Sequence, residues 1–249
     1  MARNGVLVVT GGGRGIGAAT ALLAAERGYA VVVNYSGNVE AAEAVTAAIH
    51  AKGGEAIAVR GDVSQPEDVE HIFAAADRLG TLTGLVNNAG IVGRSSKFVD
   101  MATADLHRVF AVNVFGAFLC AREAVKRMST ASGGKGGAIV NISSGAATLG
   151  SPGEFIHYAA SKGAINTMTL GLSKELAREG IRVNAIEPGM IDTEMQTASG
   201  DLGRMARIVP TVPMARAGLA DEVAGPILFL LSDAASYMTG AILRVAGGR

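Results

Sequence analysis

A glycine-rich turn joins the first apolar run of the chain to its first helical run. The run over residues 5–10 is short, continuous and β-branched, which is typical of a strand buried on both faces. The run over residues 15–27 is rich in alanine and predicts a helix. Between them stands Thr10-Gly11-Gly12-Gly13-Arg14-Gly15-Ile16-Gly17. This context predicts a dinucleotide site, because small residues let the backbone approach a phosphate and the helix N-terminus favours its charge.

The alternative interpretation of this turn is purely structural. Its spacing is Gly11-x-x-x-Gly15-x-Gly17, which differs from the commoner G-x-G-x-x-G. A tight turn between a strand and a helix also needs small residues. The loop by itself therefore leaves both interpretations open.

The alternation of apolar runs and helical stretches continues along the chain. Further strands are predicted at 30–34, 55–60, 84–87, 138–143, 181–186 and 241–245, and helices at 39–52, 66–79 and 103–128. Such alternation predicts an α/β fold, a single Rossmann-type doubly wound parallel sheet with helices on both faces. With 249 residues, we expect one NAD(P)-binding domain spanning 1–249.

Composition argues against several classes of partner. Lys plus Arg and Asp plus Glu number 22 each, so no global field attracts nucleic acid or an anionic membrane. Cys120 is the one cysteine, which rules out an intrachain disulfide. The apolar run 227–231 is too short to span a bilayer, and the N-terminus lacks a signal-peptide pattern. The four histidines are not spaced as metal ligands. We expect a cytoplasmic protein without a metal.

Tyr158 and Lys162 are the strongest chemical signal in the chain. Residues four apart share one face of a helix, so the ammonium can lie near the phenol and favour its ionised form. That pairing predicts a proton donor and acceptor. His157 invites a nucleophile interpretation with Ser144, but adjacent helical residues face different ways and no G-x-S-x-G elbow is present.

The end of the second predicted strand bears on the choice of cofactor. It reads Val33-Asn34-Tyr35-Ser36, without the carboxylate that binds the ribose hydroxyls in sites specific for NAD. A carboxylate would repel a 2′-phosphate, and Arg14 adds a favourable charge. We therefore predict NADP(H), with NAD(H) as the alternative because Asn34 can also serve it.

Together these residues resemble the short-chain dehydrogenase/reductase family over essentially the whole chain. The motifs that carry the resemblance are the loop Thr10–Gly17, Asp62-Val63, Asn87-Asn88-Ala89-Gly90, the set Asn113, Ser144, Tyr158 and Lys162, and Pro188-Gly189 followed by Thr193. Within the family, the chain is most similar to 3-oxoacyl-carrier-protein reductases and sugar dehydrogenases.

The resemblance implies a role for each motif. Asn113, Ser144, Tyr158 and Lys162 fall on the catalytic tetrad, with Ser144 preferred to Ser143 as the residue that holds the substrate oxygen. Asn113 would position a water for a proton relay through Lys162. The implied cofactor contacts are Gly11, Gly13, Arg14, Gly15, Ile16, Gly17, Asn34, Ser36, Asp62, Val63, Asn88, Ala89, Gly90, Tyr158, Lys162, Pro188, Gly189 and Thr193.

The substrate is expected to be a ketone or secondary alcohol, bound between the loops 91–98, 146–155 and a lid around 190–213. Arg94, Lys97, Arg204 and Arg207 are the basic candidates near these loops. The resemblance also implies a homotetramer through the helices 103–128 and that of Tyr158, with Ala117, Ala121, Ala124, Ala164, Thr167 and Gly171 allowing close approach. The alternative function is a non-catalytic dinucleotide-binding sensor or assembly protein.

Overall fold

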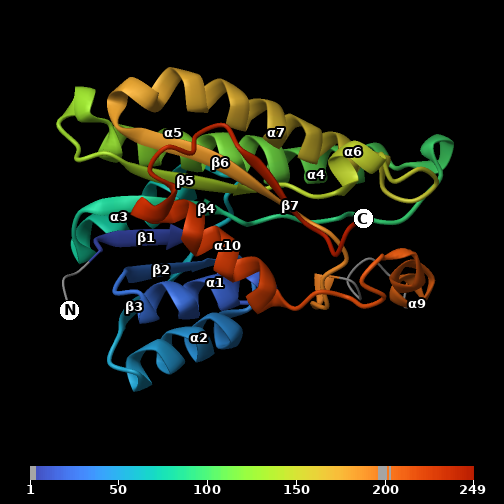
Figure 1. Ribbon diagram of the computed structural model, residues 1–249, viewed down its shortest axis with the longest axis horizontal. Helices are drawn as coiled ribbons and strands as arrows, with labels where there is room; N and C mark the ends of the chain where they lie inside the picture. Colours follow the sequence, from blue (N-terminus) through green and yellow to red (C-terminus); the bar gives the residue numbers. More distant parts are fainter. Residues whose placement is uncertain (1–3, 196–200, 202) are drawn as a thin grey trace.

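A computed structural model describes residues 4–195, 201 and 203–249, and it confirms the predicted fold class. In this part of the chain, seven strands form one sheet in the order β3-β2-β1-β4-β5-β6-β7. Every neighbouring pair is parallel. Successive strands are added outward from β1 in one direction and from β4 in the other (Figure 1). The carboxyl ends of β1 and β4 therefore flank the crevice where such sheets bind ligands.

The strands lie close to their predicted positions. They are β1 (Val6–Val9), β2 (Ala30–Tyr35), β3 (Glu55–Arg60), β4 (Leu82–Asn87), β5 (Gly137–Ile142), β6 (Ile181–Pro188) and β7 (Ile242–Val245). Two boundaries differ by two residues: β4 starts earlier than expected and β6 ends later, while the other boundaries agree to within one residue. The end of β6 is extended because Glu187 and Pro188 pair with Arg244 and Val245 of β7, a contact between distant segments.

Helices cover both faces of the sheet. They are α1 (Gly15–Glu26), α2 (Val39–Ala51), α3 (Pro66–Leu79), α4 (Thr103–Phe110), α5 (Ala117–Met128), α6 (Ala146–Leu149), α7 (Ile156–Leu176), α9 (Arg204–Ile208) and α10 (Ala220–Leu231). Pro66 occupies the first turn of α3, as predicted, because a proline there forfeits no helical hydrogen bond.

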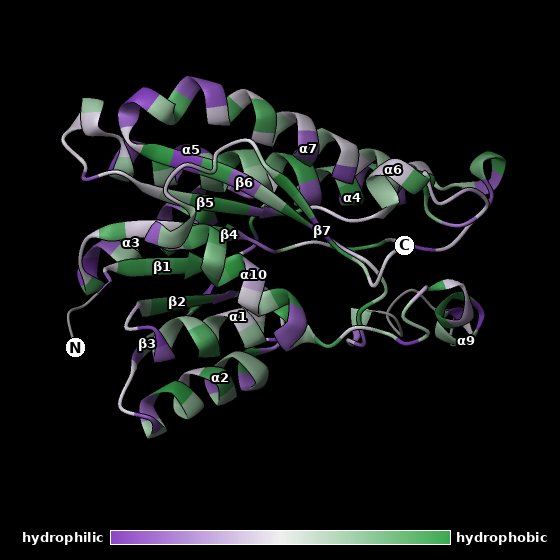
Figure 2. Cartoon of the chain, viewed as in Figure 1, coloured by the Kyte–Doolittle hydropathy of each residue, from purple (hydrophilic) through white to green (hydrophobic). Residues whose placement is uncertain are grey.

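Two apolar cores lie on opposite faces of the sheet. One packs α3, α5 and α7 against the strands and includes Phe73, Cys120 and Ile165. The other packs α1, α2 and α10 and includes Val45 and Ile227. Strands such as β1 are buried on both sides, which explains their continuous hydrophobic colour in Figure 2. Cys120 is fully buried and packs as a small hydrophobe, as expected.

The predicted single helix over 103–128 contains an irregular turn. Helical structure is continuous, but the turn Ala111–Gly116 between α4 and α5 is π-helical. A π turn is wider than an α turn and often lies at a functional site. It carries Asn113 to a buried position beneath the crevice. At Gly116 an added Cβ would lie 2.7 Å from a methyl of Val63, so the turn also packs closely on the end of β3.

Among the described residues, 103–128 is the helical run long and apolar enough to cross a membrane by length and composition. One face of it lies in the core through Cys120, Ala121 and Ala124. Core helices of this length commonly satisfy the same criterion.

Candidate active site

Thr10 and Asn88 fasten the glycine-rich loop to the end of β4. The Thr10 hydroxyl accepts hydrogen bonds from the backbone N–H groups of Asn88 and Ala89, both at 3.0 Å. The Asn88 amide donates to the carbonyls of Thr10 and Gly11 at 2.9 and 3.0 Å. At Gly17 an added Cβ would lie 2.3 Å from the Gly11 oxygen. The loop is therefore held between β1 and β4, where only glycine fits.

The start of α1 offers an uncapped helix N-terminus. Arg14 occupies the N-cap position, but its side chain caps no backbone N–H, and the first turn has no acidic residue. Gly11 and Gly15 have φ of 61° and 50°, which favours glycine. These features fit a pyrophosphate, because the N–H groups of the first turn and the helix dipole both favour an anion. We call this site, formed by the loop Gly11–Gly17 and the first turn of α1, the anion cradle.

Asn34, one of the expected cofactor contacts, lies beneath the loop. Its side chain is almost wholly buried. The side-chain oxygen accepts from the Gly11 N–H at 3.2 Å, while the amide donates to the carbonyls of Val59 and Gly61 at 3.3 and 3.0 Å. Asn34 thus ties the loop to the ends of β2 and β3.

Arg14 and Ser36 lie on the open side of the same region. Both are exposed, and they follow the ends of β1 and β2, which are neighbours in the sheet. Gly13 packs against α2, since an added Cβ would lie 3.2 Å from the Ala42 nitrogen. The surface that would receive a 2′-phosphate therefore has a cation and a hydroxyl and is bordered by α2.

Asp62 and Val63 follow β3, next to the cradle. The Asp62 carboxylate accepts from the Ser64 hydroxyl at 2.7 Å and from Arg108 at 2.9 Å. Burial raises the pKa of Asp62, but the hydrogen bonds from Ser64 and the Arg108 charge outweigh it, so the net pKa is lowered. Val63 is buried against Gly116. An anionic acceptor thus stands where the adenine pocket is expected.

Asn113 joins the loop after β4 to helix α7, which carries Tyr158 and Lys162. Its side chain accepts from the Ile91 N–H at 2.8 Å and donates to the Ile91 carbonyl at 2.9 Å. The same amide donates to the Ser161 hydroxyl at 3.0 Å. At Gly90 an added Cβ would lie 3.3 Å from the Asn113 oxygen and 3.5 Å from the Lys162 amine. The π turn therefore brings Asn113 beside Lys162.

Ser143 and Ser144 differ sharply in their surroundings. Ser143 is buried, and its hydroxyl donates to the Lys162 carbonyl at 3.1 Å. Ser144 is partly exposed and lies close enough to Tyr158 to lower the pKa of the phenol. Only Ser144 is therefore placed to touch a substrate beside the phenol.

Tyr158 and Lys162 share one face of α7, as the spacing predicts. The Lys162 amine lies 5.6 Å from the centre of the Tyr158 ring and donates to the Ile142 carbonyl at 2.7 Å. Burial lowers the pKa of Lys162 to about 8. The pKa of Tyr158 is raised by burial, although the Ser144 hydrogen bond and the Arg204 charge oppose the rise. The expectation that Lys162 lowers this pKa is thus not met in the protein alone.

The segment after β6 passes over the glycine loop. The Gly189 N–H donates to the Val245 carbonyl at 2.9 Å, and the Pro188 carbonyl accepts from Gly145 at 2.9 Å. An added Cβ at Gly15 would lie 3.1 Å from the Thr193 methyl. Thr193 therefore borders the glycine-rich loop. Of the predicted lid around 190–213, residues 196–200 and 202 lie outside the described residues.

Three predicted substrate loops meet at Glu154. Its carbonyl accepts from the Ser96 N–H at 3.0 Å, which joins the loop 91–98 to the loop 146–155. Its carboxylate accepts from Arg204 and Arg207 of α9, both at 3.1 Å. Figure 1 shows α9 and α6 at the same end of the molecule. Glu154 escaped the sequence analysis because its arginines lie about fifty residues away along the chain and share no local motif with it.

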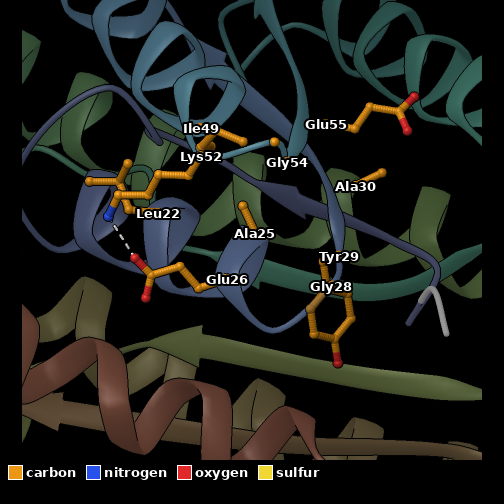
Figure 3. Close-up of a pocket in the computed structure, with 11 residues that line it drawn as sticks. Leu22, Ala25, Glu26, Gly28, Tyr29, Ala30, Ile49, Lys52, Gly54 and Glu55 are labelled. Carbon is orange, nitrogen blue, oxygen red and sulfur yellow. Dashed lines mark hydrogen bonds and ion pairs between the residues drawn. The ribbon is translucent and has the colours of Figure 1, made fainter. Parts of the chain in front are cut away.

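A groove of about 470 Å³ lies elsewhere, between α1, α2 and the starts of β2 and β3. Among its lining residues, Lys52 and Glu26 form an ion pair of 2.7 Å, which Figure 3 marks with a dashed line. None of its lining residues belongs to the predicted site, which lies at the opposite ends of the strands. The described residues also contain no cluster of three or more histidine, cysteine or acidic side chains that could hold a metal.

The two serines provide a matched test of the site. We expect Ser144→Ala to lower kcat/KM roughly a hundredfold, the usual effect of losing one hydrogen-bond donor to a developing oxyanion. Ser143→Ala should instead cost about 1 kcal/mol of stability, because its hydroxyl bonds a buried carbonyl. Steady-state kinetics and thermal unfolding of both variants separate the effects. Equal kinetic losses would contradict the assignment.

The parallel sheet, the anion cradle and the serine–tyrosine–lysine set define a dinucleotide-dependent oxidoreductase. Residues 11–249 match the sequence profile of the family described as Enoyl-(Acyl carrier protein) reductase. The chain is 51% identical over 245 residues to the uncharacterized oxidoreductase YgfF of Escherichia coli, covering 98% of this chain and 99% of the relative. This protein belongs to the short-chain dehydrogenase/reductase family.

Other similar proteins support the same family assignment. The chain is 42% identical over 245 residues to a 3-oxoacyl-(acyl-carrier-protein) reductase of Synechocystis, covering 98% of this chain and 96% of the relative. Among solved structures, a Sinorhizobium meliloti dehydrogenase/reductase has a TM-score of 0.92 at 34% identity, covering 99% of this chain and 95% of that one. A mutant Serratia marcescens short-chain dehydrogenase/reductase has a TM-score of 0.91 at 34% identity, and the match covers 99% of this chain and 98% of that one. The family uses nicotinamide dinucleotide cofactors.

Proposed function

We propose that this protein transfers hydride between NADP(H) and a ketone or secondary alcohol, with Tyr158 as the acid and base. The observation that carries the proposal is the placement of Lys162 one helical turn from Tyr158 on the same face of α7, with its amine 5.6 Å from the centre of the phenol ring. Bound nicotinamide would supply or accept the hydride. Ser144 would hold the substrate oxygen, and Tyr158 would give it a proton in reduction and take one in oxidation.

The remaining residues support this chemistry. Asn113 would hold the loop after β4 in place beside Lys162, and it would position a water next to the Lys162 amine. Lys162 would bind the nicotinamide ribose and add its charge near the phenol once its ammonium is stabilised there. Pro188, Gly189 and Thr193 would border the nicotinamide. The cytoplasmic location expected from the sequence stays a prediction.

The proposal is tested by following NADPH absorbance with the purified protein and a panel of ketones, including 3-oxoacyl thioesters and keto sugars. Consumption of NADPH that requires a ketone supports an enzyme. Tight NADPH binding with no turnover on the whole panel would favour the sensor or assembly alternative.

Cofactor preference depends on Arg14 in this proposal. Arg14→Ala should weaken NADPH binding about tenfold and leave NADH binding nearly unchanged, because only NADPH carries the 2′-phosphate. Arg27→Ala, at the other end of α1 and also exposed, is the matched control. Dissociation constants for both cofactors give the measurement. Equal losses, or tighter NADH binding in the unmodified protein, would contradict the assignment.

We also propose a homotetramer, with a corrected surface. Ala117, Ala121 and Ala124 are buried inside the chain and cannot face a symmetry mate. The exposed face of this long helix instead carries Phe115 and Phe118, which are 63% and 49% exposed.

On α7, Leu170 is 42% exposed, and nothing lies within 4 Å of a Cβ added at Gly171. Exposed aromatic side chains on the helical run 103–128 and an open helix surface on α7 favour association between copies.

Light scattering should give four times the chain mass at micromolar concentration. Phe118→Glu should lower that mass, because a charge would be buried between copies. A monomer mass for the unmodified protein would refute the tetramer.

A further inference from the structure

A buried carboxylate at the end of β6 pairs with an arginine of the neighbouring strand β7. Glu187 and Arg244 are partners in the parallel register, so their side chains share one face of the sheet. The Nε and Nη2 atoms of Arg244 donate to one oxygen of Glu187 at 3.0 and 2.8 Å. The Glu187 side chain is only 4% exposed. The carboxylate is therefore held by the protein and fixes the orientation of the guanidinium.

The same carboxylate is tied to helix α7. Its second oxygen accepts from the Asn166 amide at 2.8 Å. Asn166 lies four residues after Lys162, which is one helical turn along α7. Through Glu187, the guanidinium of Arg244 is thus fixed relative to the helix that carries Tyr158 and Lys162.

Arg244 also reaches the short helix α6. Its Nη2 atom donates to the Thr148 hydroxyl at 2.5 Å. Helix α6 has only four residues, and none of them is buried. A helix of one turn has little stability of its own, because few backbone hydrogen bonds offset the cost of ordering it. The contact with Arg244 therefore supplies a tertiary restraint on this turn.

The restrained turn begins at the serine of the proposed site. The Thr148 hydroxyl donates to the Gly145 carbonyl at 3.1 Å, and the Gly145 N–H donates to the Pro188 carbonyl at 2.9 Å. The Ala146 N–H donates to the Ser144 hydroxyl oxygen at 3.1 Å. Accepting this bond leaves the Ser144 proton for another acceptor. The direction of the Ser144 hydroxyl thus depends on where the backbone of the turn lies.

We propose that Arg244 is a positioning residue for Ser144: buried Glu187 fixes its guanidinium, which holds in place, through Thr148, the helical turn that starts at Ser144. The inference rests on the proposed function, in which Ser144 holds the substrate oxygen. It gives the last strand of the sheet a part in hydride transfer, because an ion pair between β6 and β7 sets the place of Ser144 relative to α7.

Thr148→Val is the first test, because it keeps the size of the side chain and leaves Arg244 paired with Glu187. We expect it to lower kcat/KM for ketone reduction about tenfold, less than the loss expected for removing the Ser144 hydroxyl itself. In a Ser144→Ala background the same change should cost less than about twofold, since no hydroxyl is left to position. Thr148→Ser keeps the hydroxyl and should retain nearly full activity.

Arg244→Met removes the other end of the contact. It should also lower kcat/KM about tenfold, and together with Thr148→Val it should cost no more than either change alone, because both break one contact. Thermal unfolding monitors the Glu187 carboxylate that Arg244→Met leaves unpaired. If this variant is unstable, adding Glu187→Gln removes the buried charge and restores a protein that can be assayed.

Hydrogen exchange of the segment 144–155, labelled from milliseconds to minutes, measures the restraint without relying on activity. Thr148→Val and Arg244→Met should each speed it about threefold or more. Thr46→Val is the matched control: its hydroxyl also donates to a carbonyl three residues earlier, that of Glu43 at 3.0 Å, but in α2. It should change neither kcat/KM nor exchange in this segment.

Equal losses of kcat/KM from Thr148→Val with and without the Ser144 hydroxyl would overturn the proposal, because the contact would then act on stability or binding alone. Unchanged exchange in Arg244→Met would also overturn it. Full activity in Ser144→Ala would instead refute the role of Ser144 in the proposed function, while the exchange rates would still show whether Arg244 holds the turn.

Discussion

Replacing Tyr158 by Phe is expected to lower turnover by roughly two to four orders of magnitude, the usual contribution of a positioned general acid. The substitution removes one hydroxyl and keeps the ring, so packing around the half-buried side chain changes little. NADPH affinity should survive, because the cradle and Lys162 are untouched. Single-turnover and steady-state rates, together with an NADPH dissociation constant, provide the measurement.

Tyr29→Phe is the matched control for this experiment. Tyr29 lies immediately before β2 and lines the groove between α1 and α2. Its substitution also removes a phenolic hydroxyl, but at the opposite end of the sheet from Tyr158. Its turnover should equal that of the unmodified protein. Near-normal turnover in Tyr158→Phe would mean that another group donates the proton, and the central claim would fail.

Lys162→Ala should damage both turnover and cofactor affinity. Turnover should fall at least about a hundredfold, or about 2.7 kcal/mol of transition-state stabilisation. The loss of affinity distinguishes it from Tyr158→Phe, because the amine lies between Gly90 and the Ile142 carbonyl, where the ribose is expected. Calorimetric titration with NADPH measures the affinity, and thermal unfolding checks that the buried site still folds.

The same residue predicts a pH dependence. With a pKa lowered to about 8, Lys162 is charged below that pH and loses its charge as the pH rises through it. NADPH affinity should therefore weaken above about pH 8 in the unmodified protein, and this dependence should be absent in Lys162→Ala. If both proteins showed the same pH profile, another group would be responsible.

Local patterns predicted the fold because the strands are short, largely apolar runs and the early helices are alanine-rich or begin at a clear signal such as Pro66. They also placed Tyr158 and Lys162 together, since the contact is set by helical spacing alone. The π turn at Ala111–Gly116 was not predicted, because its residues form helix equally well in either register. It depends on tertiary contacts, such as the one between Gly116 and Val63.

Site residues that act through distant partners were the least predictable. Glu154 carried no sequence signal, because the arginines that pair with its carboxylate lie on another element, α9. The alanines of α5 were assigned to an outer face that the structure shows to be the inner one. Their small size is compatible with either environment, so only the packing against the sheet decides between them.

The buried position of Asn34 has a practical consequence for redesigning cofactor selectivity. The obvious route toward NAD(H) is to install an acidic residue at the end of β2, and Asn34→Asp looks like the smallest such step. Here it would exchange an amide that donates to two carbonyls for a carboxylate facing those same oxygens. The substitution would loosen the glycine loop for either cofactor. A substitution at exposed Ser36 avoids this problem, because a new carboxylate there stays hydrated and leaves the hydrogen bonds of Asn34 intact.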